Sequence, residues 1–83
     1  MTANEAYKIL LNEVDGMKAA KCTEYDSVFV FQLVPEGFDV SNSAEVLFSG
    51  LYSVNKETRE VRDFKPFHIP VSEYRNGKPA VFN

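Results

Sequence analysis

The candidates for acid–base or nucleophilic chemistry are a single histidine, His68, and a single cysteine, Cys22. His68 stands between two apolar residues, with no second imidazole or nearby cysteine to complete a metal site. As a general base it would need an orienting carboxylate such as Asp63 or Glu73, which only folding could supply. Lys21 adjoins Cys22, but on a strand it points to the opposite face and does not activate the thiol. We therefore expect Cys22 to be a small buried side chain.

Glu24 and Asp26 share a strand parity, and paired carboxylates in a cleft are typical of hydrolases. Here they flank a turn, so we expect them to be solvated. The charged run over residues 56–63 alternates in sign and indicates a solvated hairpin tip. The sequence has no glycine-rich phosphate loop, nucleophile elbow or metal-ligand spacing. We expect a protein that is not an enzyme and has no cofactor; a small hydrolase using Glu24, Asp26 or His68 is the least favoured alternative.

Composition narrows the class of protein. The 83 residues, 45% of them hydrophobic, predict one domain over residues 1–83 with a single thin core. The seven Phe and four Tyr favour strands. A net charge of −3 gives no basic footprint for nucleic acid. No apolar stretch approaches the roughly 20 residues of a membrane span, and no signal peptide is recognisable. We expect a soluble protein in a reducing compartment.

One helix is predicted over residues 3–15. Thr2 and Glu5 have the spacing of a capping box, and Gly16 is a natural left-handed stop after the last turn. Apolar residues recur behind the cap at three- and four-residue steps, which defines one buried face. The members of that face expected to enter the core are Ala6, Leu10 and Val14.

The first two predicted strands cover residues 18–25 and 27–34. The earlier one is a weak pattern that fits an edge strand, with Lys18 and Lys21 discouraging unwanted pairing. The later one is apolar on both faces and is typical of a central strand that the helix covers on one side. Pro35 ends it, because proline cannot donate to a central ladder.

Two further strands, residues 45–54 and 60–65, form a hairpin around a polar connector. Gly50 within the first of them suggests a β-bulge or a close approach of the helix. The remaining tail, residues 68–83, is expected to be irregular. Residues 70–74 could form one helical turn with proline at its start. Asn76-Gly77 is a turn signal, but Pro79 discourages a returning strand.

The predicted fold class is α+β: an N-terminal helix packed on an antiparallel meander of about four strands, with an irregular C-terminal tail. The sheet face away from the helix is too aromatic to be fully wet, so the tail or a second copy of the chain should cover it. A homodimer is one expected outcome. The tail residues expected to anchor onto the sheet are Tyr74, Val81 and Phe82.

A protein partner is the other expectation. The connector over residues 36–43 is either a loop that tucks an aromatic side chain onto the sheet or a recognition loop. The candidate interaction surface combines this connector with exposed aromatic side chains of the sheet and tail. Its members are Phe38, Val40, Phe29, Phe31, Tyr74 and Phe82.

A longer pattern carries a family resemblance. It consists of Cys22, then Phe29-Val-Phe-Gln-Leu-Val-Pro35, then Tyr52-Ser-Val-Asn-Lys56, followed by Val61, Asp63-Phe64 and Pro66. It resembles small uncharacterised proteins encoded in prophages of Firmicutes and, more weakly, PepSY-type domains and small toxin-immunity families. The resemblance implies an α+β fold and a phage-derived origin.

One position departs from the pattern, because Arg59 stands where those proteins have glycine. The turn is expected to need a positive φ there, at a cost of about 1 kcal/mol for a residue other than glycine.

The leading functional hypothesis is a non-enzymatic, phage-derived interaction or structural protein, in the host cytoplasm or associated with the virion. The alternative is an immunity-type or PepSY-like inhibitor module that binds a toxin or protease through residues 36–43 or an exposed sheet face. Neither hypothesis includes binding to nucleic acid or to a membrane.

Overall fold

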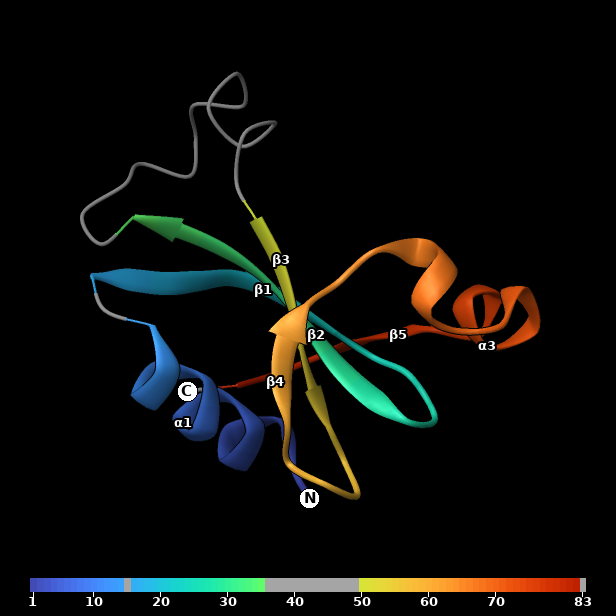
Figure 1. Ribbon diagram of the computed structural model, residues 1–83, viewed down its shortest axis with the longest axis horizontal. Helices are drawn as coiled ribbons and strands as arrows, with labels where there is room; N and C mark the ends of the chain where they lie inside the picture. The colour runs from blue at the N-terminus through green and yellow to red at the C-terminus, as the bar shows by residue number, and fades with distance from the viewer. Residues whose placement is uncertain (15, 36–49, 83) are drawn as a thin grey trace.

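The computed structural model describes residues 1–14, 16–35 and 50–82 (Figure 1). These residues form one antiparallel five-stranded sheet, a helix at the N-terminus and a short helical segment near the C-terminus. The elements are α1 (Ala3–Glu13), β1 (Met17–Glu24), β2 (Val28–Pro35), β3 (Gly50–Asn55), β4 (Val61–Asp63), the 3-10 helix η1 (Pro66–His68), α3 (Val71–Arg75) and β5 (Lys78–Ala80). The predicted α+β class is confirmed.

The strand order in the sheet is β4-β3-β2-β1-β5. β1 to β4 are the predicted meander, and β5 adds a strand that was not predicted, beside β1. The expectation that β1 is an edge strand is therefore wrong along its second half, where Cys22, Thr23 and Glu24 pair with β5. Pro79 is tolerated in β5 because this is the edge strand of the sheet.

α1 begins at the predicted cap. The Glu5 N–H donates to Thr2 Oγ1 at 3.2 Å, and the Thr2 hydroxyl donates to Glu5 Oε1 at 3.4 Å. The helix ends two residues earlier than the predicted residue 15, because Val14 is extended, with φ −128° and ψ 134°. Val14 still donates its N–H to Leu10 O at 3.2 Å and packs against the core. Gly16, at φ 70°, then leads the chain into β1.

Among the described residues the register of the sheet shifts in β1, between Ala19 and Lys21, whereas the pairs of Gly50–Asn55 with β2 show no bulge. Gly50 instead pairs regularly with Leu33 as the first residue of β3. The described part of the second predicted hairpin is shorter than expected, since β4 contains three residues. The predicted strand residues 45–49 lie outside the described part of the chain.

β2 is the predicted central strand, buried on both faces. On one face its side chains pack under α1 in a first core cluster. The buried members of that cluster are Ala3, Ala6, Leu10, Cys22, Phe29, Phe31, Leu33 and Val54. On the other face lies a second core cluster, formed by Tyr25, Val28, Val30, Phe64 and Ile69, with Leu51 packed against it.

The second face is thus covered by the chain itself, through Phe64 and Ile69 at the two ends of the segment that contains η1. The helical turn expected over residues 70–74 is present as α3, but the expectation that the rest of the tail is irregular is wrong, because β5 follows α3 and pairs with β1. α1 and α3 lie toward opposite ends of the longest axis of the molecule (Figure 1).

α3 is tied to the sheet by polar and aromatic contacts. The backbone N–H and the hydroxyl of Ser27 both donate to Glu73 Oε1, at 2.8 and 2.6 Å. The ring of Tyr74 stacks on Tyr25 with centroids 5.7 Å apart. The chain after α3 also passes close to the Tyr25 ring at Gly77. A side chain would not fit there, because a Cβ on Gly77 would lie 2.9 Å from Tyr25 Cζ.

Candidate binding site

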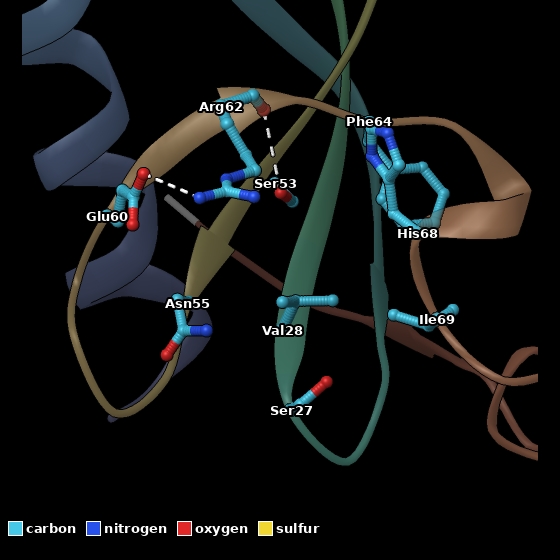
Figure 2. Close-up of a pocket in the computed structure, with 9 residues that line it drawn as sticks. All are labelled: Ser27, Val28, Ser53, Asn55, Glu60, Arg62, Phe64, His68 and Ile69. Carbon is cyan, nitrogen blue, oxygen red and sulfur yellow. Dashed lines mark hydrogen bonds and ion pairs between the residues drawn. The ribbon is translucent and has the colours of Figure 1, made fainter.

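A pocket with a volume of about 170 Å³ opens on the sheet face opposite α1 (Figure 2). It lies where β2, β3 and β4 meet the segment around η1. Apolar side chains of the second core cluster form one part of the wall, and polar side chains of the β3–β4 hairpin form the other. The lining residues are Ser27, Val28, Ser53, Asn55, Glu60, Arg62, Phe64, His68 and Ile69.

Strand alternation and register bring the polar residues together. Ser53 and Asn55 have the same parity on β3, and Arg62 is the direct cross-strand partner of Ser53. Ser53 is 4% exposed, and its hydroxyl donates to Arg62 O at 3.5 Å. The pocket therefore has a buried hydroxyl group among its polar lining groups.

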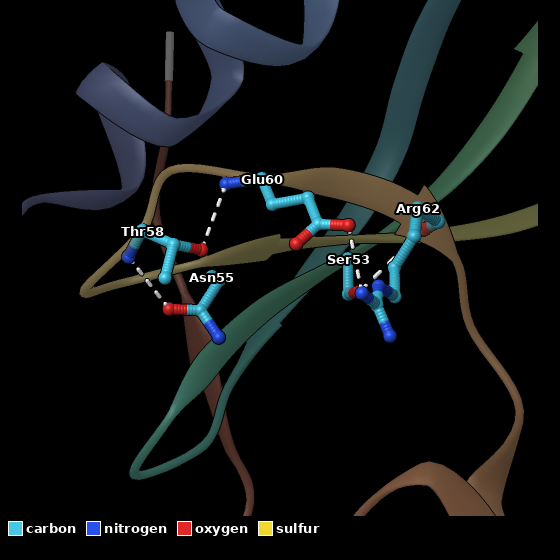
Figure 3. Close-up of polar contacts among 5 residues, drawn as sticks. All are labelled: Ser53, Asn55, Thr58, Glu60 and Arg62. Carbon is cyan, nitrogen blue, oxygen red and sulfur yellow. Dashed lines mark hydrogen bonds and ion pairs between the residues drawn. The ribbon is translucent and has the colours of Figure 1, made fainter.

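Arg62 is the cation of the pocket. Its Nη2 lies 2.7 Å from Glu60 Oε1, and both side chains are more than half exposed (Figure 3). A guanidinium has a planar fork of N–H donors that matches a carboxylate. The Glu60 carboxylate thus occupies the position of an anionic ligand on Arg62.

His68 lines the pocket beside Phe64. Its ring Nδ1 accepts from the backbone N–H of Lys65 at 3.2 Å, and the backbone N–H of His68 donates to Lys65 O at 2.9 Å. Because Nδ1 accepts, Nε2 carries the hydrogen of the neutral ring. His68 makes edge contacts with Phe64 and Phe67, with centroid distances of 6.2 and 4.8 Å. Phe67, whose ring contacts His68, is itself 80% exposed.

A second, smaller pocket of about 150 Å³ lies at the β1–β2 end of the sheet. Glu24 and Asp26 both line it, so the structure does bring the predicted acidic pair to one place. Glu24 is however paired with Lys56, whose Nζ is 2.7 Å from Glu24 Oε2 and 4.9 Å from the Phe29 ring centroid. His68 lines the other pocket, so the residues of the hydrolase alternative are not united.

Cys22 is buried, as predicted, with 3% exposure. Burial, and secondarily the charge of Glu24, raise the pKa of the Cys22 thiol from 9.0 to about 12. The thiolate is the nucleophilic form of cysteine, and this environment disfavours it. Burial, followed by the influence of Tyr74, also raises the pKa of Tyr25.

The structure divides the predicted interaction surface. Phe29 and Phe31 are only 2% and 0% exposed under α1, so they are not available on a surface. Phe82 is half-buried in edge contacts with Tyr7 and Phe31 at 4.9 and 5.5 Å, and serves as the predicted anchor. Tyr74 remains 43% exposed. Phe38 and Val40 lie outside the described residues.

Of the other two expected anchors, Tyr74 stacks on Tyr25, whereas Val81 is 93% exposed and does not pack on the sheet. The residues that sequence reasoning missed are Ser53, Asn55 and Arg62. The available signal was parity, because Ser53 and Asn55 alternate with the apolar Tyr52 and Val54 and so place two polar side chains on one face of the strand. Arg62 and Asn55 had been assigned only to a solvated hairpin.

No family model, curated protein or solved structure matches this chain. Within residues 1–14, 16–35 and 50–82, no group of three or more His, Cys, Asp or Glu side chains is placed to hold a metal ion. No helix among these described residues is long and apolar enough to cross a membrane.

Proposed function

We propose that this protein is a non-enzymatic protein-binding module. Its binding face comprises the pocket around Ser53 and Arg62 together with the adjoining rings of His68 and Phe67. The observation that carries this proposal is the contact between His68, which lines a polar pocket, and the exposed ring of Phe67. Interfaces combine such features, because aromatic and arginine side chains supply most of the binding energy.

The exposed apolar residues near η1 support this assignment. Phe67, Val71 and Tyr74 are 80%, 67% and 43% exposed and all lie on the short segment that includes η1 and α3. Single exposed hydrophobic residues are ordinary, whereas several on one segment are typical of interaction sites.

The same segment is fixed in place, which favours binding. Ser27 holds Glu73 through two hydrogen bonds, and Tyr25 stacks against Tyr74. A partner would therefore meet a preorganised surface and would not have to order it, which lowers the entropy cost of association.

Both functional hypotheses from the sequence are compatible with a binding module, and they differ in the partner. A phage-derived interaction or structural protein would bind another phage component or a second copy of itself. An immunity-type inhibitor would bind a toxin or a protease. Gene neighbours separate these proposals: capsid or tail genes support the first, and an adjacent toxin gene supports the second. Light scattering tests the homodimer, which a strict monomer at high concentration would contradict.

The binding face can be tested without knowing the partner. A random peptide library is selected against the immobilised protein, and enriched peptides are titrated into the labelled protein while amide chemical shifts are recorded. We expect shifts centred on Phe67, His68 and Arg62. Phe67→Ser should weaken binding by about tenfold or more, as for a central interface aromatic.

Val81→Ser is the matched control, because Val81 is also highly exposed but belongs to the chain after β5. It should leave peptide binding unchanged. Failure to enrich any binding peptide, or shifts confined to another face, would overturn the proposed function.

A further inference from the structure

We propose that the pocket binds a carboxylate of the partner, and that Arg62 releases Glu60 in order to bind it. This inference rests on the proposed function and specifies the ligand of the same site. The internal carboxylate of Glu60, with its Oε1 2.7 Å from Arg62 Nη2, shows that the guanidinium can be reached by an anionic group in this place. The partner's carboxylate would take over that contact.

The pocket offers more donors than Arg62 alone. Asn55 Oδ1 accepts from the N–H groups of Glu57 and Thr58 at 2.8 and 2.9 Å, which fixes the orientation of the amide. Its nitrogen therefore points away from the turn, on the side of Val28 (Figure 2). A ligand rich in acceptor oxygens fits this set of donors.

The Glu60 side chain can leave Arg62 without disturbing the hairpin. Its backbone is held by the turn, since its N–H donates to Thr58 Oγ1 at 3.2 Å and its carbonyl accepts from the Asn55 N–H at 2.9 Å. Its side chain is 56% exposed and can rotate into water without moving the strand. Because exposed ion pairs are weak, releasing Glu60 weakens ligand binding by no more than severalfold.

The apolar wall of the pocket strengthens the contact between Arg62 and the partner's carboxylate. Val28 and Phe64 are 8% and 4% exposed, and they border the pocket together with Ile69. A carboxylate held between this wall and Arg62 would lose part of its water, and electrostatic attraction strengthens as the surrounding medium becomes less polar. The volume of about 170 Å³ suits one side chain or one chain end of the partner.

Two isomeric probes test the inference and separate the two sources of a carboxylate. Acetyl-glutamate α-amide has only a side-chain carboxylate, whereas acetyl-glutamine has only a C-terminal carboxylate. Acetyl-glutamine α-amide is the neutral control. Each is titrated to about 50 mM at constant ionic strength, with detection at the Arg62 guanidinium Nε–H and the amides of Ser53 and Asn55.

We expect saturable shifts with at least one of the two carboxylate probes, and the probe that binds more tightly identifies the source. Arg62→Gln should abolish saturation. Glu60→Gln should tighten binding severalfold, because it removes the internal competitor. The matched controls are Asp63→Asn and Lys65→Gln, which make the same charge changes in a neighbouring exposed pair with an Nζ–Oδ2 distance of 3.6 Å. Neither of these residues lines the pocket.

Equal binding of the neutral probe, no saturable shift with either carboxylate, or unchanged or weaker binding by Glu60→Gln would overturn the inference. The proposed function fails separately. Library peptides that bind the face without an acidic group would leave the binding module standing and remove the carboxylate site. If a carboxylate probe binds but no library peptide does, the carboxylate site stands and the proposed binding module fails.

Discussion

The backbone N–H of Arg59 donates to the carbonyl oxygen of Asn55 at 2.9 Å, and Arg59 closes this turn with a φ of 64°. It is the only non-glycine residue with positive φ among the described residues. The left-handed conformation brings the Cβ of an L-residue too close to its own backbone, whereas glycine has no Cβ. The hairpin that presents Arg62 is therefore closed by a strained residue.

Arg59→Gly is expected to raise the free energy of unfolding by about 1 kcal/mol, since glycine adopts this φ without the steric penalty. Thermal or urea unfolding measures the change. Arg59→Ala is the control: it removes the exposed guanidinium but keeps a Cβ at positive φ, so its stability should remain near that of the original protein. A glycine variant no more stable than the alanine variant would contradict the strain.

Neighbouring leucines on α1 provide a test of the core. Leu10 is 0% exposed in the first core cluster, whereas Leu11 is 38% exposed. Leu10→Ala should destabilise the protein by about 2–5 kcal/mol, because it leaves a cavity under the helix. Leu11→Ala should change stability by no more than about 0.5 kcal/mol. Urea unfolding of both variants makes the comparison, and similar losses for the two would contradict the orientation of α1.

The contact between Ser27 and Glu73 should couple α3 to the β1–β2 turn. Glu73→Ala is expected to cost about 1 kcal/mol, since two hydrogen bonds to a partly exposed carboxylate are lost. A double-mutant cycle with Ser27→Ala isolates the hydroxyl part of this coupling. Hydrogen exchange of α3 amides should accelerate in Glu73→Ala and not in the neighbouring control Ser72→Ala. Additive effects in the cycle would show that the hydroxyl contributes no coupling.

Cys22 should make the protein sensitive to alkali. Its pKa is raised to about 12 in the folded chain from 9.0, so between these values the unfolded chain loses a proton that the folded chain keeps. Stability should therefore fall as the pH rises through this window, and Tyr25, whose pKa is also raised, acts in the same direction. Urea unfolding at a series of pH values measures the slope.

Thiol labelling gives an independent check on the burial of Cys22. At about pH 8 a disulfide reagent should react slowly with the native protein and rapidly in denaturing urea, because only the accessible thiolate attacks. Rapid labelling of the native protein would contradict the burial of this side chain. The denatured sample serves as the control for reagent activity.

The local signals in the sequence located much of the fold. The cap at Thr2, the two-faced apolar pattern of β2 and the turn strained at Arg59 each depend on residues close together in the chain. Their geometry follows from backbone hydrogen bonding and side-chain alternation over a few positions. For that reason the start of α1, the central strand and the hairpin were predictable.

The site itself was not predictable from the same signals. Ser53, Arg62 and His68 become neighbours only because β3 pairs with β4 and the segment around η1 folds back over the second face. Likewise, Pro79 argues against a strand when read alone, yet the edge beside β1 accepts it. These outcomes depend on contacts between residues far apart in the chain, and no local periodicity encodes which partner a sheet edge or an apolar face will find.

The sequence by itself thus determined the helix face, the alternation of the strands and the conformation of the turn, since these depend on local sterics. Only the tertiary structure decided that the chain covers its own second sheet face, that Phe29 and Phe31 are buried, and that Arg62 faces a pocket. Burial is a property of the packed chain as a whole, because it depends on which surfaces meet and exclude water.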